Sequence, residues 1–259
     1  MLKDKIALVT GAGRGIGRGI ASHLAGLGAR AVLVSRSMGE LETLAAEIRA
    51  AGGTAHCVTG SVSDPASVES LIEAAYAAFG RLDILVNNAG IVEEAEFLDI
   101  SEESWLRVIG TNLTGTFLMT QRAARRMKEH GGGAIINIAS IDAHGYDGPQ
   151  ASYVASKAGI VGLTKDAAKS LAPFGIRVNT VSPGWVRTKM IEDFLRPEQL
   201  DYMLHRFERV PMRRLIEVRE VAAAVAFLGS DAASGITGID IPVDGGTLAT
   251  LGAYESLPA

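Results

Sequence analysis

Three side chains in the middle of the chain have the types and spacing needed to move a proton at a carbonyl group. Tyr153 and Lys157 stand four residues apart in Tyr153-Val-Ala-Ser-Lys157, so on a helix they point from one face into the same space. A free phenol has a pKa of roughly 10 and exchanges no proton readily at neutral pH. A nearby ammonium lowers that pKa, and the hydroxyl of Ser140 can polarise a carbonyl oxygen. The same spacing also occurs in ordinary amphipathic helices, so the rest of the chain decides its meaning.

A second group of residues, near the start of the chain, could hold a phosphate. Residues 6–10 form a short β-rich run, and a helical pattern follows over residues 15–27. Between them Gly11, Gly15 and Gly17 fit the spacing G-x-x-x-G-x-G, whereas G-x-G-x-x-G fails in every frame. Such glycines let the backbone approach a pyrophosphate that sits over a helix N-terminus. A glycine-rich turn without a ligand is the alternative interpretation.

Alternating strands and helices must position both groups. Apolar runs predict further strands at about 31–35, 56–59, 82–86, 134–139, 176–181 and 239–243. Helical patterns lie at about 40–51, 65–79, 150–171 and 218–228, and two more helical stretches lie between about 101 and 128, the second through Thr120 to Lys128. Strands separated by helices imply right-handed crossovers. We therefore predict an α/β fold, a single-domain Rossmann-type doubly wound parallel sheet with helices on both faces, over residues 1–259. The irregular stretch 185–213 follows a strand, which predicts a substrate lid; a satellite core or a subunit contact are the alternatives.

Composition limits the class of protein. With 259 residues, 47% of them hydrophobic, and a net charge of −4, the chain suits one large globular domain. The basic residues Arg122, Arg125, Arg126 and Lys128 are interpreted as a solvated helix face, so we expect no nucleic-acid partner. The lone Cys57 and five scattered histidines predict no metal site. No apolar run could span a bilayer and no charged-then-apolar leader is present, which predicts a cytoplasmic protein without a membrane partner.

The motifs stand in one order along most of the chain, from about Lys5 to Gly246. That order resembles the classical short-chain dehydrogenase/reductase family. The residues that carry the resemblance are Gly11, Gly15 and Gly17, the run Asn87-Asn88-Ala89-Gly90, Asn112, Ser140, Tyr153 with Lys157, and Pro183-Gly184.

The resemblance implies a role for each catalytic residue. Tyr153 would be the general acid in reduction and the base in oxidation, and Lys157 would lower its pKa and hold the nicotinamide ribose. Ser140 would bind the substrate oxygen. Asn112 would anchor a water that links Lys157 to solvent; an amide within a helix can also open the backbone ladder to water. A polar residue on a helix surface is the alternative for Asn112.

The resemblance also implies the residues that hold the nucleotide. Pro183, Gly184 and Thr188 would meet the nicotinamide amide, and Asn88 would either shape the wall behind the cofactor or only form a turn. The whole predicted set is Gly11, Arg14, Gly15, Ile16, Gly17, Ser35, Arg36, Val62, Asn88, Ala89, Gly90, Tyr153, Lys157, Pro183, Gly184, Val186 and Thr188.

The choice between the two nicotinamide cofactors depends on the end of the second strand. NAD-preferring members of this fold end that strand with an acid that holds the ribose hydroxyls. Here Ser35 stands at that point and Arg36 follows it. Because no carboxylate there repels a 2′-phosphate and Arg14 and Arg36 can reach it, we predict NADP(H), with NAD(H) as the alternative. Ser61 replaces an Asp that many relatives place near the adenine, so the backbone at Val62 would serve there.

The resemblance leaves the substrate open. The first hypothesis is an oxidoreductase that interconverts a ketone and a secondary alcohol, both small molecules. Its pocket would be formed by Ser140, Asp142, His144, Tyr146, Gln150, Tyr153 and Trp185. Asp142, His144 and Gln150 could bind the hydroxyls of a polyol or sugar, as an NAD-dependent dehydrogenase would, whereas Trp185, Met190 and Phe194 favour an apolar group.

Two further hypotheses and an assembly state follow from the same resemblance. A 3-oxoacyl-[acyl-carrier-protein] reductase is less favoured, because Gly131 and Phe174 stand where such members offer basic residues to an acidic carrier. A dinucleotide-binding regulator without turnover is disfavoured, because every catalytic residue is present. Relatives are commonly tetramers joined through the helix of Tyr153 and through the last helix and strand, so we expect a homotetramer.

Overall fold

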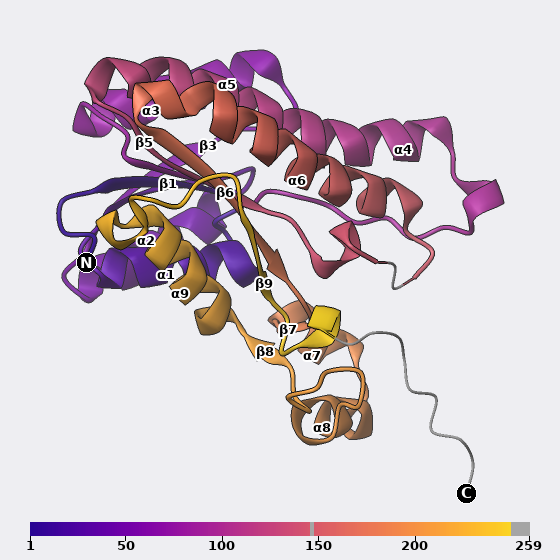
Figure 1. Cartoon of the computed structure of the whole chain (residues 1–259). Coiled ribbons are helices and arrows are strands. Elements are labelled where there is room, and N and C mark those ends of the chain that lie inside the picture. The colour runs from indigo at the N-terminus through magenta and orange to yellow at the C-terminus, as the bar shows by residue number, and fades with distance from the viewer. Residues whose placement is uncertain (146–147, 250–259) are drawn as a thin grey trace, which may run out of the picture.

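A seven-stranded parallel sheet runs through the computed structural model, which describes residues 1–145 and 148–249 (Figure 1). Its strand order is β3-β2-β1-β4-β5-β6-β9. The strands are β1 (Ile6–Thr10), β2 (Arg30–Ser35), β3 (Thr54–Thr59), β4 (Ile84–Asn87), β5 (Gly133–Ile138), β6 (Ile176–Pro183) and β9 (Asp240–Val243). The order reverses between β1 and β4, which opens a crevice at the carboxyl ends of these strands. The predicted doubly wound sheet is confirmed.

Helices cover both faces of the sheet because each central strand is apolar on both sides. In β1, Ala7 and Val9 face one core and Ile6 and Leu8 face the other. The first core is closed by α1 (Gly15–Gly26), α2 (Met38–Ala50) and α9 (Val218–Gly229), and the second by α3 (Pro65–Phe79), α5 (Gly115–Met127) and α6 (Ala151–Leu171) (Figure 1).

Local sequence signals explain where several elements begin. The carboxylate of Asp64 accepts hydrogen bonds from the amides of Ala66 and Ser67, and Pro65 occupies the first turn, as the sequence predicts. The strand predicted over residues 82–86 begins instead at Ile84. The carboxylate of Asp83, just before it, binds the amide of Ile6 at 2.8 Å, so this residue connects two strands through its side chain.

The two helical stretches predicted between residues 101 and 128 are joined by a turn of wider helix. This part of the chain consists of α4 (Glu102–Ile109), a π-helical turn over Gly110–Thr114, and α5. A π-helical turn widens the backbone ladder and is common at functional sites. Asn112 lies within this turn, which is the local opening that the sequence predicted for an amide in a helix.

The segment over residues 185–213 is more regular than its sequence predicted. It contains α7 (Lys189–Phe194) and α8 (Pro197–His205), and β7 (Val186–Arg187) pairs with β8 (Ile216–Glu217) to join its two ends. A separate apolar core holds the segment together, formed by Met203, Phe207, Val210 and Leu215. The segment projects beyond the carboxyl ends of β6 and β9 (Figure 1). It has the satellite core that was one alternative, and its role as a lid stays a prediction.

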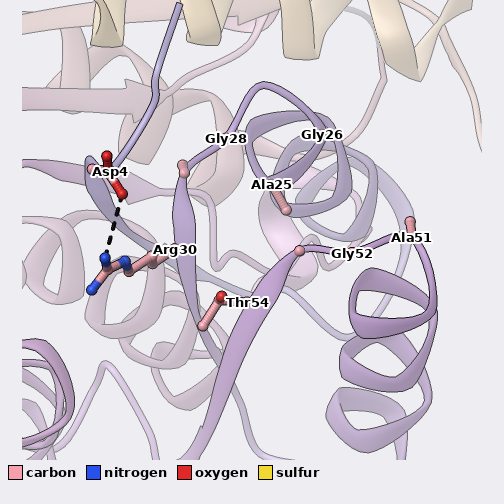
Figure 2. A pocket seen from close by; sticks show the side chains of 10 residues that line it. Asp4, Ala25, Gly26, Gly28, Arg30, Ala51, Gly52 and Thr54 are labelled. Atoms are coloured by element: carbon pink, nitrogen blue, oxygen red, sulfur yellow. Dashed lines mark hydrogen bonds and ion pairs between the residues drawn. The ribbon is translucent and has the colours of Figure 1, made fainter.

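The opposite end of the sheet is also hollowed. A hollow of about 380 Å³ lies at the amino ends of β2 and β3, and glycines such as Gly28 and Gly52 line it (Figure 2). Its charged residues, Asp4 and Arg30, are paired at 3.3 Å. Across the described part of the chain, helices with the length and apolar character needed to cross a bilayer are absent.

Candidate active site

The predicted catalytic residues meet at the carboxyl end of β5. Tyr153 and Lys157 lie one turn apart on α6, and the Lys157 Nζ is 5.4 Å from the centre of the Tyr153 ring. Ser140 stands two residues after the end of β5 and forms a hydrogen bond with Tyr153. Lys157 is only 4% exposed, and its Nζ donates to the carbonyl oxygen of Ile138 at 2.8 Å. The end of the strand thus fixes the ammonium group beside the phenol.

Burial sets the protonation of this pair. Burial raises the pKa of Tyr153 to about 12; the hydrogen bond with Ser140 opposes that rise and the charge of Asp142 adds to it. Burial lowers the pKa of Lys157 to about 8, against the opposing charge of Asp142. Burial is the largest cause of the shift, and the lowering of the Tyr153 pKa by Lys157 that the resemblance implies stays a prediction. At neutral pH the phenol carries its proton, as a general acid must.

Asp142, which could have been only a polar residue of a surface loop, is bonded to Ser140. Ser140 Oγ donates to Asp142 Oδ2 at 2.9 Å and accepts from the amide of Asp142 at 3.1 Å. Asp142 is 9% exposed, so its carboxylate is held inside the site. His144, two residues on, is exposed, and its Nε2 lies 2.6 Å from Asp240 Oδ2 on β9. Asp142 is thus bonded to one of the predicted catalytic residues, whereas His144 is bonded to β9.

The side chain of Asn112 ties three parts of the site together. Its Oδ1 accepts from the amide of Ile91 at 2.8 Å, and its Nδ2 donates to the carbonyl of Ile91 at 2.9 Å and to Ser156 Oγ at 3.0 Å. It is fully buried, which excludes the alternative of a polar residue on a helix surface. Sequence reasoning missed Ser156, although its place beside Lys157 on α6 was a usable signal.

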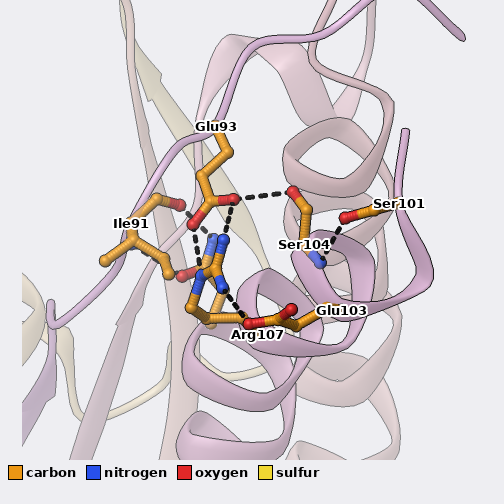
Figure 3. Close-up of polar contacts among 7 residues, drawn as sticks. Ile91, Glu93, Ser101, Glu103, Ser104 and Arg107 are labelled. Carbon is orange, nitrogen blue, oxygen red and sulfur yellow. Dashed lines mark hydrogen bonds and ion pairs between the residues drawn. The ribbon is translucent and has the colours of Figure 1, made fainter. Parts of the chain in front are cut away.

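A second clamp holds the loop that follows β4. Both carboxylate oxygens of Glu93 accept from Arg107 on α4, each at 2.6 Å, and one also accepts from Ser104 Oγ at 2.6 Å (Figure 3). These hydrogen bonds lower the pKa of Glu93 to about 2. Because Ile91 lies in the same loop, the clamp supports the backbone that Asn112 holds. No motif in the sequence marked it.

The glycine turn is braced from the neighbouring strand. Asn88 Nδ2 donates to the carbonyl oxygens of Thr10 and Gly11, at 3.0 and 3.3 Å. A Cβ on Gly11 would lie 2.9 Å from that amide nitrogen, and one on Gly17 would overlap the same group. Thr10 Oγ1, which the sequence analysis overlooked, accepts from the amides of Asn88 and Ala89 at 3.0 Å. Asn88 therefore holds the turn closed against β4.

The turn and the start of α1 fit a dinucleotide phosphate. Helix α1 begins at Gly15, and Arg14 before it makes no side-chain cap, so the first amides of the helix are available to an anion. A Cβ on Gly15 would meet only Thr188 Cγ2, at 4.0 Å. Thr188, just before α7, therefore lies close to the glycine turn. Ile16 lies half-buried in the first turn of α1.

The remaining predicted nucleotide residues line the same crevice floor. Val62 is buried against α5, and a Cβ on Gly90 would lie 3.2 Å from Asn112 Oδ1. Pro183 ends β6, and the amide of Gly184 donates to the carbonyl of Val243 at 3.0 Å. Val186 is buried in β7. These groups lie at the carboxyl ends of the strands, where this fold binds its ligands.

The adenosine end of the crevice is charged and exposed. The Ser35 hydroxyl is engaged within its own turn, since it accepts from the amide of Ser37 and donates to the Ser37 carbonyl, both at 3.1 Å. Arg14 and Arg36 are exposed, and neither side chain pairs with any residue that the structure describes. Two unpaired guanidinium groups therefore remain available to an anionic ligand.

The outer part of the predicted substrate pocket is only partly defined. Gln150 precedes the first turn of α6, and Trp185 packs edge-to-face on Phe207 at 5.6 Å between ring centres, as part of the core of the 185–213 segment. Tyr146 and the side chains of Met190 and Phe194 lie outside the described residues. Over residues 1–145 and 148–249 no group of three or more His, Cys, Asp and Glu side chains could hold a metal ion.

Comparisons with known proteins agree with this geometry. A family model described as "Enoyl-(Acyl carrier protein) reductase" matches residues 11–247. The chain is 43% identical over 256 residues to an L-rhamnose 1-dehydrogenase (NAD(P)(+)) of Azotobacter vinelandii, covering 97% of this chain and 99% of that protein. It is 42% identical to a 3-oxoacyl-[acyl-carrier-protein] reductase of Staphylococcus aureus, covering 95% and 99%. A short-chain type dehydrogenase/reductase from Mycobacterium marinum superposes with a TM-score of 0.88 at 38% identity, covering 96% and 97%.

Proposed function

Because the chain belongs to the short-chain dehydrogenase/reductase family, we propose that it uses NADP(H) to interconvert a ketone and a secondary alcohol, with Tyr153 as general acid and base. As a member of that family it is an oxidoreductase that acts on CH–OH and C=O groups with NAD(P). The observation that carries the proposal is the cluster of half-buried Tyr153 with buried Lys157 and Ser140, beside a turn that fits a dinucleotide. The relatives are named as enzymes, so a dinucleotide-binding regulator without catalysis is the least supported alternative.

The residues of this cluster divide the proton chemistry between them. The nicotinamide, when bound, donates the hydride in reduction and accepts it in oxidation. In reduction Tyr153 gives its proton to the carbonyl oxygen, while Ser140 Oγ turns from Asp142 and donates a hydrogen bond to that oxygen. Lys157 stabilises the phenolate that remains. In oxidation the phenolate of Tyr153 takes the hydroxyl proton back.

The preference for NADP(H) is supported by the two unpaired arginines. Arg36 follows the end of β2 and Arg14 stands in the glycine turn, from which both could reach a 2′-phosphate on the adenosine ribose. The test is a direct titration of NADPH and NADH on the same purified protein. We expect NADPH to bind more tightly, and equal or tighter binding of NADH would contradict the proposal.

A sugar or polyol is a second candidate substrate, favoured by one observation. The buried carboxylate of Asp142 lies beside Ser140, where it can accept a hydrogen bond from a hydroxyl next to the reacting carbon. The relative named as an L-rhamnose 1-dehydrogenase points to the same class. We expect Asp142→Leu to reduce oxidation of a polyhydroxylated substrate much more than reduction of a simple ketone. Equal losses on both would favour a purely structural role.

A carrier-bound 3-oxoacyl group is the third candidate, since one relative carries that name. Gly131 and Phe174 offer no charge to an acidic carrier, and Phe174 is 49% exposed. Lys128 Nζ, however, lies 6.0 Å from the Phe174 ring centre and places one cation nearby. Saturable reduction of a carrier-bound substrate that weakens steeply with salt would support this candidate.

We also propose a homotetramer in the cytoplasm, as the sequence predicted. A hollow of about 320 Å³ between α5 and α6, with Phe117 and Phe174 at its rim, supports association through these helices. In α9, Ala222 and Ala226 are fully buried, and this helix packs on α1 within the chain. Light scattering tests the assembly, and a monomer would contradict it.

A further inference from the structure

This fold binds the adenosine ribose in the gap between the glycine turn and the end of β2. The amide of Ala12 donates to the carbonyl of Val34 at 2.9 Å, so the turn is fixed against the last residues of the strand. The strand ends without an acid, and the Ser35 hydroxyl is engaged with Ser37. Any carboxylate that reads the ribose must therefore come from another element.

Glu40 brings a carboxylate to this gap from the first turn of α2. A Cβ built on Gly13 would lie 3.0 Å from the Cβ of Glu40, and its nearest neighbour would be Glu40 Oε2. Gly13 has no positive φ, so its backbone does not require glycine. The glycine at this position instead makes room for Glu40, whose side chain extends over the turn.

The ordinary explanation for Glu40 is a helix cap, and the contacts exclude it. Ser37 and Glu40 have the spacing of a capping box, in which each side chain would bind the other's backbone amide. The Ser37 side chain makes no cap hydrogen bond, and the Ser37 amide donates to Ser35 Oγ. The Glu40 side chain makes no hydrogen bond or ion pair with any residue in the described part of the chain. Its carboxylate thus remains available to a ligand.

We propose that Glu40 is a specificity-determining residue for the cofactor. Its carboxylate replaces the missing strand-end acid: it accepts a hydrogen bond from a ribose hydroxyl of NAD(H) and repels the 2′-phosphate of NADP(H). Arg14 and Arg36 act in the opposite direction, so the balance of these three charges sets how far the protein discriminates between the cofactors. This inference rests on the proposed function, in which the arginines read the phosphate.

The test compares Glu40→Gln with Glu42→Gln, which removes an exposed carboxylate from the same helix at a distance from Gly13. Binding of NADPH, NADH, 2′,5′-ADP and 5′-ADP is measured by calorimetry, without turnover. We expect Glu40→Gln to tighten NADPH and 2′,5′-ADP by about tenfold and to weaken NADH and 5′-ADP a few-fold. The gain for 2′,5′-ADP should shrink at 0.5 M salt, because the charges are exposed. Glu42→Gln should leave all four affinities within about twofold.

Two outcomes separate this inference from the proposed function. If Glu40→Gln alters no affinity, or alters all four ligands alike, the inference is overturned whatever the wild-type preference. The double variant Arg14→Ala/Arg36→Ala tests the arginines by themselves. If it leaves NADPH affinity unchanged while Glu40→Gln raises it, the arginine assignment fails and the role of Glu40 stands.

Discussion

The two ends of the cofactor crevice satisfy their polar groups in opposite ways. At the catalytic end Asn112 and Lys157 are buried and bonded to the backbone of Ile91 and Ile138. At the adenosine end Arg14 and Arg36 are exposed and, among the described residues, have no partner. Proton transfer requires atoms fixed to within tenths of an ångström, whereas discrimination of a phosphate needs only charge of the correct sign within reach.

This difference predicts different consequences of mutation. Changes at the catalytic end should be large, insensitive to salt and in some cases costly to folding, because buried groups lose their partners. Changes at the adenosine end should be smaller, sensitive to salt and neutral to folding, because the charges there already face water.

The largest effect should come from Tyr153→Phe. Removing the hydroxyl abolishes proton transfer, so kcat/KM should fall by roughly 10³-fold in both directions, within the range for a general acid or base. Calorimetric affinity for the cofactor should change little, because the aromatic ring remains. Steady-state kinetics with either candidate substrate class measures the loss, and turnover within tenfold of wild type would show that another group moves the proton.

Asn112→Ala should affect both catalysis and folding. It removes the partners of the Ile91 amide and carbonyl and of Ser156 Oγ, all within the interior. We expect the free energy of unfolding to fall by about 3 kcal/mol, together with a clear loss of kcat. Denaturant titration measures the first effect. Ser156→Ala, which removes only one of these bonds, is the matched control and should cost about 1 kcal/mol; equal losses would contradict the network.

Double substitution of Arg14 and Arg36 by alanine should weaken NADPH binding by about tenfold and leave NADH nearly unchanged. Titration at low and high salt measures the change, and the wild-type preference should itself decrease with salt. Arg18→Ala is the control, because Arg18 is already paired with Glu47 at 2.6 Å. A loss of NADH affinity equal to that of NADPH would indicate a general disruption of the turn and not the loss of a phosphate contact.

The catalytic end was the more predictable from sequence, for a physical reason. Side-chain spacing on a helix places Tyr153 beside Lys157. A residue that follows a strand, such as Ser140, lies at the carboxyl end of the sheet in any doubly wound fold. The rise in the pKa of Tyr153 could not be read from the sequence, because burial depends on packing that no local pattern encodes. The approach of Glu40 to Gly13 could not be predicted either. It brings α2 against the glycine turn, and the spacing of Ser37 and Glu40 suggests a helix cap instead.

The smallest effect, and the one that best separates charge from geometry at the catalytic end, is expected from Asp142→Asn. The amide keeps an acceptor for Ser140 Oγ but removes the negative charge that raises the pKa of both Tyr153 and Lys157. Without it the phenol loses its proton at lower pH. Oxidation needs the phenolate, so the rising limb of its pH–rate profile should move to lower pH, and the falling limb for reduction should move in the same direction.

Because the carboxylate is buried, the displacement should persist at high salt, unlike the effect of the adenosine-end arginines. Asp166→Asn, which removes an exposed carboxylate from the same helix as Tyr153, should leave both limbs in place. A limb that stays fixed in Asp142→Asn, or moves to higher pH, would show that the charge of Asp142 does not reach the phenol.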